Sequence, residues 1–81
     1  MIVGSWRGNK EILTFRKDKS FEVDDLKGKW FKRGKYLTIE VTTRIGNAEK
    51  TKRRYEVDEK FLYIEGQDGE MIKYRRRKIR D

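Results

Sequence analysis

The side chains that most often carry out catalysis are missing or scattered in this sequence. It contains no histidine and no cysteine, so it lacks the commonest general base, the commonest metal ligand and any thiolate nucleophile. Three carboxylates, Glu11, Asp25 and Glu70, are expected at one rim of the fold, where paired acids can share a proton. Charged residues at strand ends are usually just solvated. We therefore expect a binding module, with no enzymatic activity, no cofactor and no metal ion.

Basic residues are the second chemically informative set. Lys and Arg number 22 against 14 Asp and Glu, which gives a net charge of +8, and 44% of the residues are charged. This balance favours polyanionic partners, although it also keeps a protein soluble. Enrichment in Lys, Arg and Glu with few amides is typical of thermophilic proteins, whereas the absence of proline argues against that origin. A thermophilic source is therefore left open.

A repeated spacing indicates the elements that position these charges. Trp6, Trp30 and Tyr55 are each followed seven residues later by Leu, and then at the next alternate position by another apolar residue. A fixed interval of this kind marks a repeated supersecondary unit. Here the unit is a hairpin, in which an aromatic-bearing strand and a polar turn lead into a strand of alternating apolar residues.

Eight short strands are predicted along the chain. Their expected ranges are 2–7, 11–16, 20–24, 28–32, 36–43, 50–57, 61–65 and 70–79, with polar turns between them. Strands joined in sequence make an antiparallel up-and-down meander. A meander with one apolar face must close on itself to remove its open edges. We therefore predict an all-β fold, a single domain over residues 1–81 that forms a small eight-stranded barrel.

Parity within the strands predicts which side chains fill this barrel. The expected interior residues are Leu13, Phe15, Phe21, Val23, Trp30, Leu37, Ile39, Val41, Tyr55, Val57, Leu62, Ile64, Ile72 and Tyr74. The more exposed apolar residues should be Ile12, Tyr36, Phe61, Tyr63 and Met71. Large interior rings can line a ligand cavity, but protein interiors pack to crystal-like density, which favours filling. Binding of a small apolar ligand inside the barrel is therefore the alternative function.

Several short motifs resemble the lipocalin (calycin) pattern, and more closely that of small bacterial lipocalin-like domains. These motifs are Gly4-x-Trp6, Leu13-Thr14-Phe15-x-Lys17-Asp18, Phe21-x-Val23, Gly28-x-Trp30 and Leu37-Thr38-Ile39. The resemblance implies that Trp6 packs against a late arginine at the closed end of the barrel, and Arg76 is the matching residue. The chain departs from the pattern at Lys19, where such domains usually have glycine. It is also much shorter than true lipocalins, so a ligand cup of their kind does not follow.

A basic wall is expected on the last three strands. Its outward side chains would be Lys52, Arg54, Phe61, Tyr63, Lys73 and Arg75. Aromatic rings flanked by basic residues on a sheet surface suit the stacking of unpaired bases, with phosphates held at the rims. The alternative is a solvated face on which aliphatic stems cover two exposed rings.

One end of the predicted barrel adds further positive charge. Its expected contributors to binding are Lys32, Arg33, Lys35, Arg77, Lys78 and Arg80. We therefore predict binding of nucleic acid or another polyanion through the wall and this basic end, and a role in protein interaction is left open. No apolar run is long enough to span a membrane and nothing resembles a signal peptide, so a cytoplasmic location is expected. The sequence identifies neither the ligand nor the oligomeric state.

Overall fold

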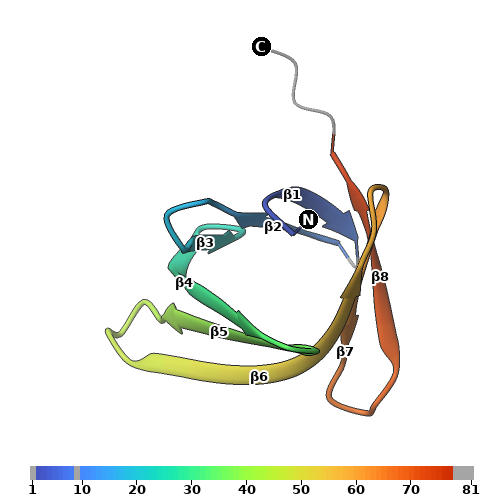
Figure 1. Ribbon diagram of the computed structural model, residues 1–81. Helices are drawn as coiled ribbons and strands as arrows, with labels where there is room; N and C mark the ends of the chain where they lie inside the picture. The colour runs from blue at the N-terminus through green and yellow to red at the C-terminus, as the bar shows by residue number, and fades with distance from the viewer. Residues whose placement is uncertain (1, 9, 78–81) are drawn as a thin grey trace.

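The computed structural model describes residues 2–8 and 10–77. Eight antiparallel strands follow one another around a closed barrel, which confirms the predicted all-β meander (Figure 1). The strands are β1 (Gly4–Gly8), β2 (Glu11–Phe15), β3 (Ser20–Val23), β4 (Leu26–Arg33), β5 (Tyr36–Thr42), β6 (Ala48–Val57), β7 (Phe61–Glu65) and β8 (Met71–Arg76). In the described part of the chain, no helix has the length and apolarity needed to cross a membrane.

Two strands begin earlier than the sequence pattern predicts. β4 starts at Leu26 and not at residue 28, because Leu26 pairs with Val23 across a turn of only two residues. β6 starts at Ala48 and not at residue 50, because the β5 ladder continues to the pair between Thr42 and Ala48. The start of β6 is polar, so alternation of apolar residues could not reveal it.

Aromatic side chains occupy the centre of the barrel. Trp6, Phe15, Phe21 and Trp30 are each at most 2% exposed. The Phe15 ring lies 4.9 Å from that of Phe21 and 5.7 Å, nearly perpendicular, from that of Trp30. These offset and edge-to-face contacts are the arrangements that aromatic rings prefer. In the interior, the Phe15 ring thus contacts the rings of both Phe21 and Trp30.

The predicted core residues form one cluster. Those that are fully buried are Leu13, Phe15, Phe21, Trp30, Leu37, Leu62, Ile64 and Tyr74, and those partly buried against them are Val23, Ile39, Val41, Tyr55, Val57 and Ile72. Ile2 is also buried, although it precedes β1 and was not predicted in the core. Its carbonyl oxygen accepts a hydrogen bond of 2.8 Å from the Trp6 indole N–H. That bond satisfies the polar group of a fully buried tryptophan.

Arg76 closes one end of the barrel, as predicted. It pairs with Trp6 across β1 and β8, and its guanidinium carbon lies 4.2 Å from the Trp6 ring centroid. The guanidinium also donates hydrogen bonds of 3.0 Å to the carbonyl oxygens of Val3 and Glu59. Gly4 makes room for it, because a Cβ atom there would lie 2.6 Å from Arg76 Nη1. Gly4, Trp6 and Arg76 therefore meet where β8 pairs with β1, and this set of contacts is called the closure.

The second tryptophan, Trp30, also has its indole N–H hydrogen-bonded to a backbone carbonyl and a cation over its ring. The Trp30 indole N–H donates to the Arg16 carbonyl oxygen at 2.9 Å, and Lys19 Nζ lies 4.3 Å from the ring centroid. Lys19 adopts a φ of 74°, a left-handed conformation that glycine takes at less cost. The departure from the glycine of the lipocalin-like pattern therefore leaves the turn intact and places a cation over Trp30.

The carboxylates expected at the opposite rim have separate partners. The hydroxyl of the buried Tyr74 donates a 2.7 Å hydrogen bond to Glu11. The pKa of Tyr74 is raised above its usual value, mainly by burial and then by this hydrogen bond. Asp25 forms an exposed ion pair with Arg44, with 2.6 Å between the charged atoms. Glu70 lies exposed in the turn before β8. Glu11 and Asp25 thus each have a partner other than a second carboxylate.

The closure can be tested by adding one methyl group. Gly4 has a φ of 137°, and a conformation of this class costs a residue other than glycine about 1–3 kcal/mol. Gly4→Ala also displaces Arg76 from Trp6, whose cation–π contact is worth about 0.5–2 kcal/mol. We expect urea unfolding to show that Gly4→Ala lowers the free energy of unfolding by about 2 kcal/mol or more.

Gly34→Ala is the matched control for this substitution. Gly34 also has a positive φ, 59°, but nothing lies within 4 Å of an added Cβ atom. The free energy of unfolding of Gly34→Ala should therefore fall only by the cost of the strained backbone, about 1–2 kcal/mol. Equal losses in the two variants would contradict a specific role for Gly4 in seating Arg76.

A second pair of variants separates backbone strain from the cation over Trp30. Lys10 and Lys19 both have positive φ, at 63° and 74°. Glycine at either position relieves about 1–2 kcal/mol of strain, but Lys19→Gly also removes a cation–π contact of about 0.5–2 kcal/mol. Lys10→Gly should therefore unfold at a higher urea concentration than Lys19→Gly. The same midpoint for both would show that Lys19 contributes nothing through Trp30.

Candidate nucleic-acid interface

β6 is a bent strand whose two parts pair with different neighbours. Residues 48–54 pair with β5, whereas only residues 55–57 pair with β7 (Figure 1). Lys52 therefore lies opposite Thr38 of β5, and Arg54 lies opposite Tyr36. The predicted wall was wrong in placing Lys52 beside β7, whereas Arg54 directly precedes the first residue of β6 that pairs with β7. It assumed that β6 pairs with β7 along its whole length.

The bend places aromatic and basic side chains together on the outer surface of β4, β5 and β6. This surface, the β4–β6 face, consists of Lys29, Phe31, Arg33, Tyr36, Thr38, Glu40, Lys50, Lys52 and Arg54. Successive rows across the three strands contain Arg33, Tyr36 and Arg54, then Phe31, Thr38 and Lys52. Glu40 is the carboxylate of the face and lies between Lys29 and Lys50. Five basic side chains of these described strands thus surround two rings.

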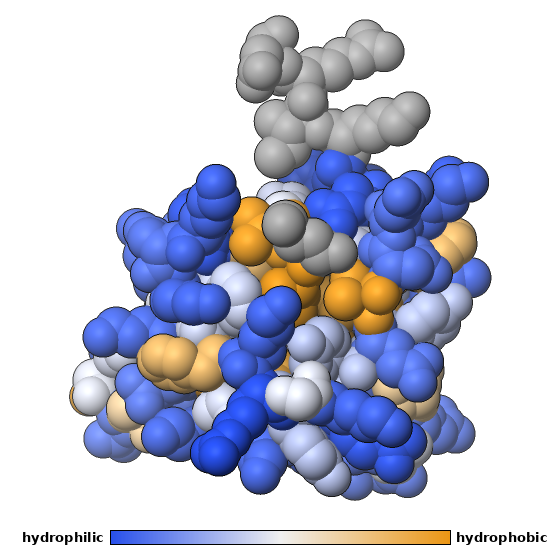
Figure 2. All heavy atoms as spheres, viewed as in Figure 1, coloured by the Kyte–Doolittle hydropathy of each residue, from blue (hydrophilic) through white to orange (hydrophobic). Residues whose placement is uncertain are grey.

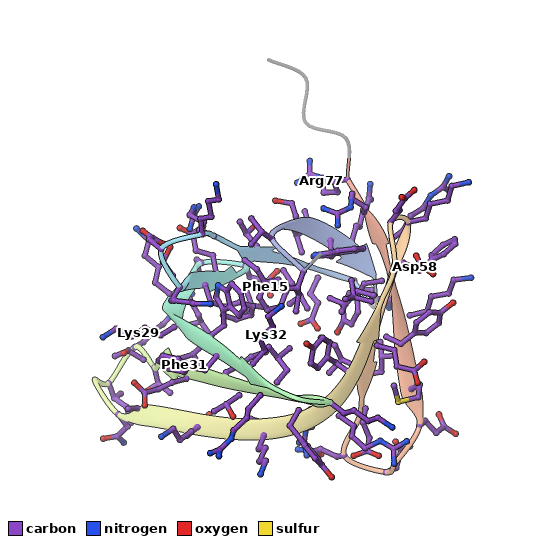
Figure 3. All side chains as sticks on the ribbon, in the orientation of Figure 1. Phe15, Lys29, Phe31, Lys32, Asp58 and Arg77 are labelled. Carbon is purple, nitrogen blue, oxygen red and sulfur yellow. The ribbon has the colours of Figure 1, made fainter. Side chains whose placement is uncertain are left out.

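Both rings of the β4–β6 face are open to solvent. Phe31 and Tyr36 are each 46% exposed, and Lys52 Nζ lies 4.7 Å from the Tyr36 ring centroid. A surface hollow of about 460 Å³ is lined by Arg33, Tyr36, Thr38 and Lys52. Figure 3 places Phe31 on the side of β4 away from the barrel interior. A flat ligand can therefore reach an aromatic ring with cations beside it.

The second basic and aromatic surface, the β7–β8 face, consists of Phe61, Tyr63, Lys73 and Arg75. Phe61 pairs with Arg75 and Tyr63 with Lys73, so these four are neighbours as predicted. The Phe61 and Tyr63 rings lie 6.4 Å apart, and Lys73 Nζ is 4.0 Å from the Phe61 centroid. Both rings are only partly exposed. They therefore offer less free ring surface than Phe31 and Tyr36.

Neighbouring strands modify the charge of the β7–β8 face. Glu56 of β6 lies opposite Tyr63, which brings a carboxylate to its edge. Arg7 of β1 lies opposite Arg75, which adds a cation that the sequence analysis did not include. The face is thus positive on its β1 side and acidic on its β6 side.

The basic end is only partly brought together. Arg33 and Lys35 are exposed around the β4–β5 turn and adjoin the β4–β6 face. Lys32 pairs with the buried Leu37 and lies on the interior side of β4, away from Phe31 (Figure 3). Arg77 is exposed at the end of β8. The predicted contributors Lys78 and Arg80 lie outside the described residues.

Figure 2 shows hydrophilic side chains over most of this view, with hydrophobic atoms near its centre.

A turn held by Asp58 positions the beginning of the β7–β8 face. Its carboxylate accepts hydrogen bonds from the backbone N–H groups of Lys60 at 2.8 Å and Phe61 at 2.7 Å. The bonds from Phe61 and then Lys60 hold the pKa of Asp58 below its usual value. Beside the turn is a hollow of about 320 Å³ lined by Glu59, Lys60, Phe61, Arg75 and Arg76.

Comparison with known proteins adds no family. A scan against protein-family models, a search of curated proteins and a search of solved structures each found no match. Phe31, Tyr36, Lys29 and Lys50 were not among the predicted binding residues, although strand parity already places all four outward. The missing signal was the pairing of early β6 with β5.

The Asp58 turn predicts a pH-dependent contribution to stability. Because folding lowers the pKa of Asp58 below its ordinary value of 3.8, its stabilising effect is fully present above that value and is lost as the pH falls below it. Asp58→Asn should be less stable than wild type at pH 7, and the difference should shrink below about pH 4. Thermal unfolding of wild type and Asp58→Asn between these pH values measures the difference in stability. A difference independent of pH would mean that the charge of Asp58 is not involved.

Proposed function

We propose that this protein binds single-stranded nucleic acid through the β4–β6 face. The observation that carries the proposal is the pair of open rings, Phe31 and Tyr36, among Arg33, Lys52 and Arg54. Every base has a flat face that can stack on an aromatic ring, while lysine and arginine attract phosphates whatever the sequence. The face therefore suits binding with little sequence preference.

The geometry favours an unpaired strand over a duplex. The two rings lie on diagonal positions of adjacent strands, which are typically about 7–8 Å apart. Each ring can thus take a separate base, provided that the base is not already stacked and paired within a helix. The basic residues extend on both sides of the rings, so a backbone crossing the strands meets cations before and after them.

The fold also suggests a family relationship. We infer that the barrel is of the small lipocalin-like type, because Gly4, Trp6 and Arg76 adopt the closure that the resemblance implies. In the interior, Trp6, Phe15, Phe21 and Trp30 take up the centre of the barrel. This packing supports a function on the outer surface rather than inside.

Stacking on the β4–β6 face should be visible in ring deletions. Tyr36→Ala and Phe31→Ala should each weaken binding of an oligothymidine strand by about 1–3 kcal/mol, the usual cost of losing one stacked base. Binding to duplex DNA should change little. Tyr63→Ala is the matched control, because its ring lies on the β7–β8 face. Fluorescence anisotropy of the labelled oligonucleotides measures these effects, and a larger loss in Tyr63→Ala would transfer the site to the β7–β8 face.

Phosphate neutralisation should appear as salt dependence. For single strands, each phosphate contact contributes about −0.7 to the slope of log affinity against log salt concentration. Lys52→Gln or Arg54→Gln should each make the slope shallower by about this amount, whereas Lys10→Gln, in the exposed turn between β1 and β2, should not. Equal changes in all three variants would indicate only diffuse attraction to the net positive charge. Absence of binding at low salt would refute the proposal.

A further inference from the structure

The first part of β6 has a neighbour on only one side. Residues 48–54 pair with β5, whereas pairing with β7 begins at Tyr55. The described strands thus leave one edge of β6 open over residues 48–53, about 20 Å of extended chain at about 3.3 Å per residue. An open edge presents unpaired N–H and C=O groups that can template another strand.

Hydrogen bonds at the two ends of the β5–β6 ladder show which groups serve β5. The Thr43 N–H donates to the Asn47 carbonyl oxygen at 2.8 Å, and the Tyr55 N–H donates to the Lys35 carbonyl oxygen at 3.0 Å. Paired residues in an antiparallel ladder alternate between bonded and non-bonded pairs. The odd-numbered residues of β6 therefore bond to β5.

The even-numbered residues of β6 direct their backbone groups the other way. Where β7 is present, the Asp58 N–H donates to the Phe61 carbonyl oxygen at 2.9 Å, which has the expected parity. Before β7 begins, the same edge presents the backbone N–H and C=O of Lys50 and Lys52. Both residues are exposed. These groups are the donors and acceptors that an added strand would use.

The charges beside the edge determine what kind of strand fits. Lys50, Lys52 and Arg54 project from the outer side of β6, and Glu49 and Arg53 project from the inner side. A second copy of this edge would place lysine opposite lysine, and like charges directly opposite each other are destabilising. A strand with carboxylates at alternate positions would match them.

We propose that the open edge of β6 binds an extended acidic peptide segment as an additional strand. Backbone hydrogen bonds to Lys50 and Lys52 supply the pairing, and carboxylates facing their ammonium groups supply the selectivity. The proposal does not depend on nucleic-acid binding, because it uses the backbone of β6 and not the rings of the β4–β6 face.

A proline substitution tests the backbone contact. Lys52→Pro removes an N–H that β5 does not use, and proline is tolerated on edge strands where its nitrogen faces away from the sheet. Lys52→Gln is the matched control, since it removes the same charge and keeps the N–H. The probe is a fluorescent eight-residue peptide alternating Glu with Val or Thr, titrated against the full chain. Lys52→Pro should bind it at least fivefold more weakly than Lys52→Gln, with thermal unfolding used to confirm that both variants are folded. Equal affinities would overturn the proposal.

Amide hydrogen exchange on the unmodified protein gives a second test that does not rely on a variant. Without peptide, the amides of Lys50 and Lys52 should exchange faster than those of Thr51 and Arg53, which bond to β5. The Glu-rich peptide should slow exchange at Lys50 and Lys52 at least tenfold and leave the other two nearly unchanged. Binding without this protection would show attraction by charge alone. Equal protection by an oligothymidine strand would assign the edge to nucleic acid. Either result would overturn the proposal.

Discussion

The contact between Arg76 and Trp6 is the constraint on which the barrel depends. A domain of this size buries only about 60% of the surface of its unfolded chain, and with no cysteine it has no disulfide to compensate. The guanidinium lies on the indole and bonds to two backbone carbonyls, which joins β8 to β1. Within each strand the buried face fixes the register, because a slip of one residue would move each side chain to the opposite face. The outward position of Phe31 and Tyr36 follows in this way from the burial of their chain neighbours Trp30 and Leu37.

The two tryptophans show how a highly charged chain can form an apolar core. Each indole N–H is satisfied by a nearby backbone carbonyl, and each ring has a cation over it, Arg76 or Lys19. Charged side chains thus cover the ends of the core without entering it. At the opposite rim, the partly exposed Glu11 accepts a hydrogen bond from the hydroxyl of the buried Tyr74.

The sequence predicts the features that depend on local periodicity. The alternation of Leu13 with Phe15 and of Leu37 with Ile39 indicates strands and their inward faces, and the repeat of Trp6 at Trp30 indicates the hairpins. It does not predict the bend of β6, because that strand is nearly all polar at its start and has no apolar pattern from which to infer a partner. The register between strands decides which outward residues become neighbours. For this reason Lys52 was correctly placed outward yet assigned to the wrong neighbouring strand, β7 in place of β5.

The two proposed binding modes use different groups of the same residues. Lys50 and Lys52 contribute side-chain ammonium groups to the β4–β6 face, and their backbone N–H and C=O groups face the open edge of β6. An acidic peptide added at the edge would bring carboxylates beside cations that otherwise attract phosphates, and at such short range the two anions are poorly screened by salt. The two ligands should therefore oppose each other's binding, and by thermodynamic linkage each should weaken the other by the same factor. In this way the bend of β6, which ends its pairing with β7 early, would couple an edge that takes a strand to a face that takes a base.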